Sequence, residues 1–249
     1  MAFDYAGQAV VVTGGTRGIG AGIASAFLAA GARVLVCGRN VPASLTDGVE
    51  FVQADVRDPE QASALIQAAV DRFGRLDVVI NNAGGAPPAK AATASPRFHA
   101  KIIELNLTAP LHVSQAANAV MQSSGRGGSI IMISSVSGTR PSPGTAAYGA
   151  AKAGLTHLAV SLAMEWAPQV RVNTVVVGLV GTEESAAHYG GPEAMAAAAA
   201  SVPLGRMATP QDVAGACLYL ASPLAAQVTG ASLLVHGGGE RPAFLPVLG

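Results

Sequence analysis

The sequence predicts a doubly wound α/β fold, in which one seven-stranded parallel sheet carries helices on both faces. Short runs of β-branched and other apolar residues alternate along the chain with longer, alanine-rich segments. Most of these runs are unbroken rather than alternating in polarity, which is typical of strands that are covered on both faces. The alternation of such strands with helix-length segments indicates crossover connections in a parallel sheet.

The strands and helices follow one another in a regular order. We interpret as strands the runs at residues 10–12, 34–36, 51–52, 78–80, 130–133, 172–177 and 233–235. The segments long enough for crossover helices are 19–30, 60–73, 98–123, 148–166 and 210–221. The connection 40–50 contains Pro42 and Gly48, which leaves little room for a helix. No internal repeat or linker divides the chain, so we expect a single domain over residues 1–249.

Two segments stand outside this alternation. Residues 183–202, in which Met195 is followed by five alanines, have two interpretations that remain open: a lid over a bound ligand, or an ordinary surface helix. The tail, residues 240–249, is apolar and interrupted by prolines. We expect the tail to dock onto this subunit or a neighbouring one.

Composition argues against several classes of function. Lys plus Arg and Asp plus Glu are 15 each, so the net charge is zero, which argues against nucleic acid and anionic membranes as partners. Charged residues are 12% of the chain, half the usual fraction of about 25%. We therefore expect other subunits of a homo-oligomer, a tetramer or a dimer, to cover part of the surface.

The sequence also predicts the cellular compartment. No run of apolar residues reaches the length of a membrane span, and no basic region precedes an apolar run at the N-terminus, so we expect no span and no secretory signal. Cys37 and Cys217 lie far apart in the sequence. The five histidines show no metal-ligand spacing. We expect a cytoplasmic protein without a metal.

A glycine-rich motif follows the first predicted strand. Residues 13–20 read T-G-G-T-R-G-I-G and open the first predicted helix. Gly14, Gly18 and Gly20 permit a tight turn, a close approach of the backbone and close packing of the helix. The helix N-terminus then offers N–H groups to a pyrophosphate, so the motif predicts a dinucleotide-binding site.

The spacing T-G-x-x-x-G-x-G resembles that of the short-chain dehydrogenase/reductase superfamily in its compact, single-domain form, similar to the 3-oxoacyl-carrier-protein reductases. Residues 81–84 read N-N-A-G and close the fourth strand, as the family's motif does. Asp55 and Val56 end the third strand, where the family places an aspartate near the adenine. The resemblance spans residues 7–239 and implies a Rossmann-type fold and an NAD(P)(H)-dependent oxidoreductase.

The end of the second strand bears on the choice of cofactor. An acidic residue there binds the ribose 2′-OH of NAD, whereas an arginine accommodates the 2′-phosphate of NADP. Residues 37–40 contain no acid, and Arg39 follows the strand, with Arg17 in the glycine loop on the same side. NADP(H) is therefore favoured. The alternative is NAD(H), with its ribose hydroxyls bound to backbone groups of Gly38 and the open 40–50 loop and with Arg39 stacked on the adenine. The predicted cofactor-binding residues are Gly14, Thr16, Arg17, Gly18, Ile19, Gly20, Arg39, Asp55, Val56, Asn82, Ala83, Gly84, Tyr148, Lys152, Gly178, Val180 and Thr182.

The chemical residues are predicted on and before the fifth helix. Tyr148 and Lys152 are four residues apart, on one face of the helix, and a lysine cation lowers the pKa of a neighbouring tyrosine. The resemblance implies a tetrad that also includes Ser135 and Asn106. Tyr148 would exchange the proton with the substrate oxygen, Ser135 would orient that oxygen, Lys152 would hold the nicotinamide ribose, and Asn106 would fix a water that links Lys152 to solvent. Ser134 is interpreted as structural.

Two positions depart from the family's pattern. Val177 stands before Gly178 where a proline is expected, which bears on how Thr182 is aimed at the nicotinamide. His236 precedes two glycines where an acidic residue is common, and the sequence suggests no function for it.

The leading functional hypothesis is the interconversion of a ketone and a secondary alcohol. An enoyl reductase of this fold would have two more residues between Tyr148 and Lys152, so double-bond reduction is disfavoured. The walls of the predicted pocket, residues 85–93, 136–144 and 179–202, are rich in Pro, Ala and Gly, which favours an apolar substrate such as a 3-oxoacyl thioester or an alicyclic or steroid-like ketone. The alternative is a nucleotide-binding regulatory protein that has lost catalysis; such a protein would be expected to lack part of the tetrad or the glycine motif.

Overall fold

The computed structural model describes residues 3–183, 185 and 191–240, and within them one seven-stranded sheet in which all neighbouring strands are parallel. The spatial order is β3-β2-β1-β4-β5-β6-β7, as predicted for a doubly wound fold. The strands are β1 Ala9–Thr13, β2 Arg33–Gly38, β3 Val49–Gln53, β4 Val78–Asn81, β5 Gly128–Ser135, β6 Val170–Val177 and β7 Ser232–Val235.

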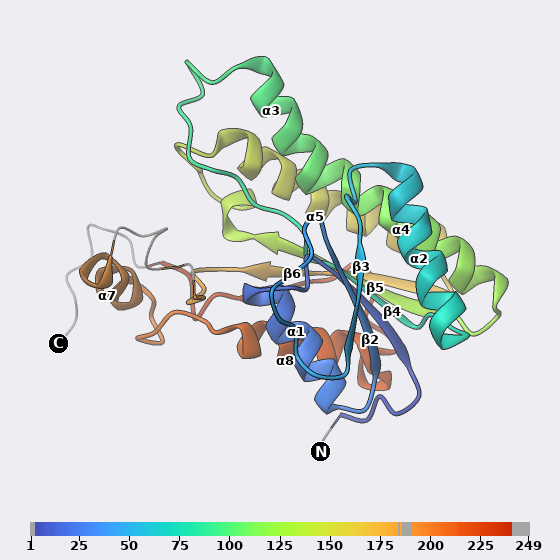
Figure 1. The fold of residues 1–249 in the computed structure, drawn as a ribbon. Helices are drawn as coiled ribbons and strands as arrows, with labels where there is room; N and C mark the ends of the chain where they lie inside the picture. The colour runs from blue at the N-terminus through green and yellow to red at the C-terminus, as the bar shows by residue number, and fades with distance from the viewer. Residues whose placement is uncertain (1–2, 184, 186–190, 241–249) are drawn as a thin grey trace.

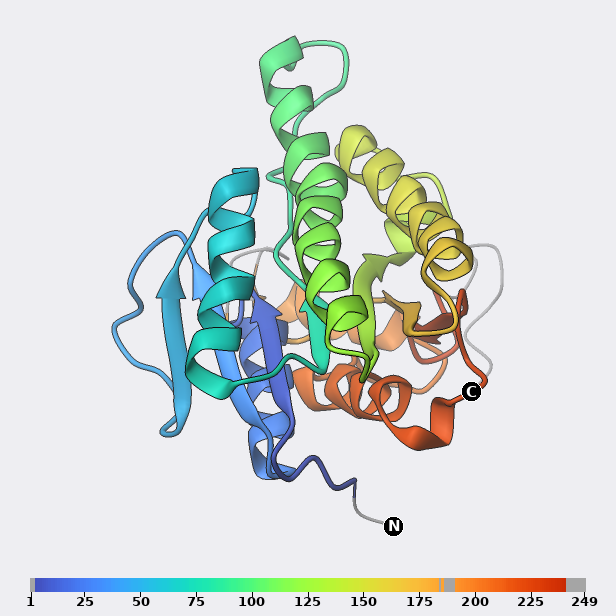
Figure 2. The ribbon, with the colours of Figure 1, turned by 90° about the vertical axis from the view of Figure 1, so that its right-hand side faces the viewer.

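Helices cover both faces of this sheet (Figures 1 and 2). One face carries α2 (Pro59–Phe73), α4 (Ala109–Ser123) and α5 (Ala146–Trp166), and the other carries α1 (Gly18–Ala29) and α8 (Pro210–Ala221). Figure 2 shows these two layers edge-on, with the sheet between them. The helix α7 (Pro192–Ser201) lies apart from these layers (Figure 1).

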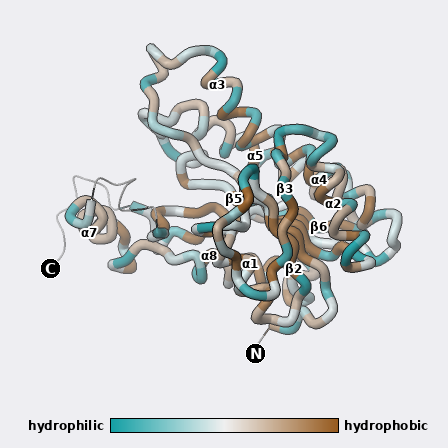
Figure 3. Tube along the Cα trace, in the orientation of Figure 1, coloured by the Kyte–Doolittle hydropathy of each residue, from teal (hydrophilic) through white to brown (hydrophobic). Residues whose placement is uncertain are grey.

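The core consists of two apolar clusters, one on each face of the sheet. The central strands are hydrophobic along their length, which Figure 3 shows as brown segments in the middle of the molecule. β1 and β4 are buried at every residue, so successive side chains along these strands pack alternately into one cluster and the other. The unbroken apolar runs in the sequence arise from this burial on both sides.

The predicted helix 98–123 is the main point at which the structure differs from the expectation. This region comprises α3 (Pro96–Ile103), a π-helical turn η1 (Glu104–Thr108) and α4. The N–H of Ala109 donates to the carbonyl of Glu104, five residues earlier, which is the π pattern. Such single π turns are frequent at functional sites, and this one carries Asn106.

The structure describes the remaining segments in part. Residues 40–48 form a connection without a helix. The segment 183–202 contains α7, whereas its residues 184 and 186–190 lie outside the described residues, so the choice between a lid and a surface helix stays open. Of the tail, only Glu240 is described. Among the described residues, none of the helices combines the length and the apolar character that a membrane span needs.

Candidate active site

The candidate site lies at the carboxyl edge of the sheet, where the strand order reverses. β1 has β2 on one side and β4 on the other, and the chain fills the first side before it continues on the second. Ligands of doubly wound sheets bind outside the carboxyl ends of the strands at such a switch point. The loops that follow β1, β4, β5 and β6 therefore border one region.

The loop between β1 and α1 lets the backbone come close to a ligand. Gly14 and Gly18 have φ values of +62° and +53°, a region that favours glycine. A Cβ on Gly20 would lie 2.3 Å from the carbonyl oxygen of Gly14, so a larger residue does not fit. At the start of α1, Arg17 makes no side-chain cap, and the first turn contains no acidic residue. The first N–H groups and the positive end of the helix dipole therefore point to an anionic ligand such as a pyrophosphate.

Side chains bind this loop to the end of β4. The Oγ1 of Thr13 accepts hydrogen bonds from the N–H groups of Asn82 and Ala83, both at 3.0 Å. The Nδ2 of Asn82 donates to the carbonyl oxygens of Thr13 and Gly14, at 2.9 and 3.1 Å. Asn82 therefore shapes the glycine loop rather than presenting its amide to a ligand.

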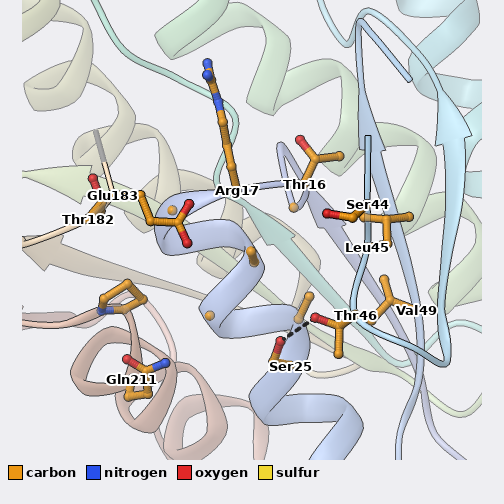
Figure 4. Close-up of a pocket in the computed structure, with 16 residues that line it drawn as sticks. Thr16, Arg17, Ser25, Ser44, Leu45, Thr46, Val49, Thr182, Glu183 and Gln211 are labelled. Carbon is orange, nitrogen blue, oxygen red and sulfur yellow. Dashed lines mark hydrogen bonds between the residues drawn. The ribbon is translucent and has the colours of Figure 1, made fainter. Parts of the chain in front are cut away.

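A cleft of about 370 Å³ runs along the first turns of α1 beside the glycine loop (Figure 4). The predicted cofactor residues in its wall are Thr16, Arg17, Gly18 and Thr182. The Cγ2 of Thr182 lies 3.6 Å from the position that a Cβ on Gly18 would take, so the loop after β6 closes against the glycine loop. Arg39 is not in the wall of this cleft.

The opposite wall of the cleft comes from the short connection between β2 and β3, whose side chains were not among the predicted site residues. Ser44, Leu45, Thr46 and Val49 line it (Figure 4). The hydroxyls of Thr46 and Ser25 are hydrogen-bonded at 3.0 Å, which ties this connection to α1. The signal in the sequence was the pair of hydroxyl residues in a connection too short for a helix.

Asp55, predicted near the adenine, already has a cationic partner. The Nε of Arg57 donates to its two oxygens at 2.9 and 3.1 Å, and the Nη2 of Arg57 makes a closer contact. The Arg57 guanidinium holds the pKa of Asp55 below its usual range, and the charge of Arg39 acts in the same direction. The field of Arg39 thus reaches the end of β3. Val56 is buried in the core, and its side chain belongs to the apolar cluster on the face of the sheet that α2, α4 and α5 cover.

Ser135 and Tyr148 meet where β5 ends and α5 begins. The Ser135 hydroxyl lies close enough to the Tyr148 phenol to lower its pKa, and the Oγ of Ser135 accepts a hydrogen bond from the N–H of Ser137 at 3.2 Å. Two glycines make this contact possible. A Cβ on Gly149 would lie 2.7 Å from the carbonyl oxygen of Ser137, and a Cβ on Gly138 would lie 2.6 Å from the backbone nitrogen of Ala153. The segment after β5 is therefore pressed onto the first turns of α5.

Lys152 is buried next to this pair. Its Nζ donates to the carbonyl oxygen of Ile133 at 2.8 Å and lies 5.6 Å from the centre of the Tyr148 ring. Burial lowers its pKa from 10.5 to about 8. The Oγ of Ser134 donates to the carbonyl of Lys152 at 3.0 Å and accepts from Thr156, which accords with a structural role for Ser134.

The pKa of Tyr148 contradicts the sequence reasoning. A neighbouring lysine was expected to lower it, but burial raises it above 10.0, and the nearby Ser135 hydroxyl offsets only part of the rise. The reason is that burial acts on both groups: it disfavours the phenolate of Tyr148 and the ammonium of Lys152 alike.

Asn106 is fully buried, and its side chain is bound within the protein. Its Oδ1 accepts from the N–H of Gly85, and its Nδ2 donates to the carbonyls of Gly85 and Ile102, all at 2.9 Å. A Cβ on Gly84 would lie 2.7 Å from this Oδ1 and 3.1 Å from the Nζ of Lys152. Gly84 thus sits between Asn106 and Lys152, and the N-N-A-G motif joins the cofactor end to the chemical end.

The segment after β6 explains the departure at Val177. Val177 pairs in register with Ser135 on β5 and with Val235 on β7, so valine extends the central ladder by one residue. A Cβ on Gly178 would lie 2.6 Å from the Cβ of His236, so glycine is required where the chain leaves the sheet. Val180 then forms an isolated parallel bridge with Ala208.

The structure thus brings Ser135, Tyr148, Lys152 and Gly84 together, and Thr182 against the glycine loop. Within residues 3–183, 185 and 191–240, no group of three or more His, Cys, Asp or Glu side chains is placed to hold a metal ion.

Known proteins resemble the chain over nearly its whole length. A family model described as enoyl-(acyl carrier protein) reductase matches residues 14–240. The L-fucose dehydrogenase of Bos taurus is 38% identical over 96% of this chain and 92% of its own. The 3-oxoacyl-acyl-carrier-protein reductase FabG of Vibrio cholerae is 36% identical over 93% of this chain and 97% of its own. The ligand-free structure of the aldohexose dehydrogenase of Thermoplasma acidophilum superposes with a TM-score of 0.89 at 30% identity, covering 96% of this chain and 97% of the other.

Proposed function

Because the chain belongs to the short-chain dehydrogenase/reductase family, whose members are NAD(P)(H)-dependent oxidoreductases, we propose that it interconverts a ketone and a secondary alcohol by hydride transfer. The observation that supports this most directly is the placement of the Ser135 hydroxyl beside the Tyr148 phenol, with buried Lys152 next to them. The pair supplies a proton donor and an orienting hydroxyl for one substrate oxygen. When bound, the nicotinamide of the cofactor donates or accepts the hydride.

The roles of the residues follow from their surroundings. Tyr148 gives its proton to the carbonyl oxygen, or takes one from the alcohol, and Ser135 holds that oxygen by a hydrogen bond. Lys152, with a pKa of about 8, exchanges protons close to neutral pH and holds the nicotinamide ribose through its Nζ. A positive nicotinamide and a protonated Lys152 both favour the phenolate of Tyr148, which opposes the effect of burial.

Asn106 acts through its backbone in this proposal. Its side-chain amide is occupied by Gly85 and Ile102. The α-helical donor to its carbonyl would be the N–H of residue 110, which is Pro110 and has none. We assign to this carbonyl the water that connects Lys152 to solvent.

For the cofactor we propose NADP(H). The end of β2 has no acidic side chain, and Arg17 and Arg39 are the two cations of the glycine loop and the β2 terminus. Arg57 already neutralises Asp55, a carboxylate on which the charge of Arg39 also acts. Arg39 therefore retains its positive field for a 2′-phosphate.

For the substrate we propose a ketone with an apolar body. A small depression beside Tyr148 is lined mainly by apolar side chains, among them Ala86, Pro87, Phe98 and Ile102. The N–H of Ala89 donates to the carbonyl of Gly144 at 2.7 Å, so the loop after β4 is fixed against the start of α5. This wall suits an acyl chain or a ring better than a polyol.

The test is the oxidation of NADPH and of NADH by the purified protein with 3-oxoacyl thioesters, alicyclic ketones, sugar lactones and enoyl thioesters, together with the reduction of NADP+ and of NAD+ with reducing sugars. Turnover of a ketone with an apolar body supports the proposal. Activity confined to reducing sugars and lactones would overturn the substrate class, and reduction of enoyl thioesters alone would overturn the reaction class.

A further inference from the structure

The loop after β5, which begins next to Ser135, carries Arg140. The backbone N–H of Arg140 donates to the carbonyl of Val136 at 3.2 Å, and the hydroxyl of Thr139 donates to the same carbonyl at 2.9 Å. Gly138 and Gly149 allow this loop to lie close against the first turns of α5. The backbone of Arg140 is therefore held one turn after Val136, the residue that follows Ser135.

The guanidinium of Arg140 binds a carboxylate from the other end of the chain. Its Nη1 donates to the carbonyl of Pro141 at 3.0 Å, and its Nη2 forms an ion pair with the carboxylate of Glu240. The two side chains are 41% and 35% exposed. A guanidinium is a planar fork of five N–H donors that fits a carboxylate or a phosphate. Within the described part of the chain, Pro141 and Glu240 engage two of these donors.

Glu240 reaches this position on a turn that only glycine adopts easily. Gly237, Gly238 and Gly239 have φ values of +63°, +97° and +91°. The turn starts at His236, which packs on Gly178 where the chain leaves β6. The ion pair thus joins the loop after β5 to the turn after β7, across the edge at which Ser135 and Gly178 lie.

We propose that Arg140 binds an anionic group of the substrate, a carboxylate or a phosphate, and that the carboxylate of Glu240 takes that place when no substrate is bound. The inference rests on the proposed function and names its substrate class: a ketone with an apolar body and an acidic end. A half-exposed ion pair contributes about 0–1 kcal/mol, so a substrate anion can displace Glu240. The glycine turn allows that displacement without a change in the sheet.

The experiment compares matched ketones with wild type and variants. The substrates are linear oxo acids from 4-oxopentanoate upwards in chain length, their methyl esters, and acetoacetyl-CoA, which separates a phosphate source from a carboxylate source. The variants are Arg140→Gln, Arg140→Lys and Glu240→Gln. Arg126→Gln is the control, because it removes an exposed arginine from the turn before β5, at the opposite edge of the sheet.

For wild type we expect kcat/KM for an oxo acid or for the CoA thioester to exceed that for the methyl ester by about tenfold or more, the effect of one charge-assisted contact. Arg140→Gln removes this preference through KM and leaves the ester within twofold, whereas Arg140→Lys retains part of it. Glu240→Gln lowers KM for the anionic substrate, and Arg126→Gln changes neither.

Equal turnover of acids, thioester and esters, or a preference that survives Arg140→Gln, would overturn the inference and leave the proposed function standing. Lack of turnover of every ketone, the neutral esters included, would overturn the proposed function and this inference with it.

Discussion

Replacement of Lys152 by methionine is expected to raise the stability of the protein while it removes activity. The Nζ of Lys152 is buried, and its pKa falls from 10.5 to about 8. Each pKa unit corresponds to about 1.4 kcal/mol, so burial of the cation costs about 3 kcal/mol at pH 7. The substitution also removes the hydrogen bond to the Ile133 carbonyl, which costs about 1 kcal/mol. We expect the free energy of unfolding to rise by about 2 kcal/mol.

The pH dependence has a defined sign. The pKa of Lys152 is lower in the folded protein than in the unfolded chain, so the unfolded chain binds more protons between pH 8 and 10.5. Below pH 8, wild type carries the full penalty of burying the Lys152 cation, and this penalty disappears as the pH rises towards 10.5. The advantage of Lys152→Met should therefore shrink between these two values.

Urea unfolding of wild type and Lys152→Met at pH 7 and pH 9.5, at one protein concentration, measures the effect. Lys101→Met is the matched control, because Lys101 is exposed on α3, and we expect it to change the unfolding free energy by less than about 0.5 kcal/mol. Turnover of Lys152→Met should fall by at least ~100-fold. If Lys152→Met were less stable than wild type at pH 7, the cation would be stabilised by its surroundings and the reasoning would be refuted.

Tyr148→Phe should lower turnover at least ~100-fold with the dissociation constant of the cofactor nearly unchanged. Tyr219→Phe on α8 is the control, and retained turnover in Tyr148→Phe would exclude Tyr148 as the proton donor. We expect wild type to bind NADPH more tightly than NADH in fluorescence titrations and Arg39→Ala to remove most of the difference; parity in wild type would show that the cofactor choice is wrong. Light scattering should give a mass well above the 24.7 kDa of one chain, because Met164 on α5 and Leu234 on β7 are 81% and 53% exposed. Met164→Glu with Leu234→Glu should lower that mass, and a monomeric wild type at micromolar concentration would contradict the expectation.

Hydrophobic pattern was sufficient to predict the sheet. Unbroken runs such as residues 130–133 identify buried strands because parallel strands are covered on both faces. The same pattern failed at Glu104–Thr108, since a π turn adds one residue per turn without altering the apolar spacing enough to be seen. Pro110 was the available signal: it follows Asn106 by four residues and removes a helical hydrogen bond there.

Motif spacing predicted that the candidate residues Tyr148 and Lys152 lie close together, but it did not predict how burial shifts their pKa values. The i, i+4 spacing placed Tyr148 and Lys152 side by side, whereas the depth at which β5 and α5 bury them depends on Gly138 and Gly149, which the motif does not contain. Asp55 shows the same limit. It was predicted to end the third strand, but β3 ends at Gln53, and Asp55 binds Arg57 in the turn that leads into α2.

The helix-free connection between β2 and β3 is the wall of the cleft beside α1 that can change most easily in evolution. Residues 40–48 contribute hydroxyls to the cleft beside α1, yet the sheet pairing of β2 and β3 does not depend on a helix there. The glycine loop, by contrast, is locked by Thr13, Asn82 and the contact at Gly20. Substitutions and changes of length in residues 40–48 can therefore alter one wall of this cleft while the glycine loop stays unchanged. The fold thus separates a constant wall of the cleft from a wall that sequence change can remodel.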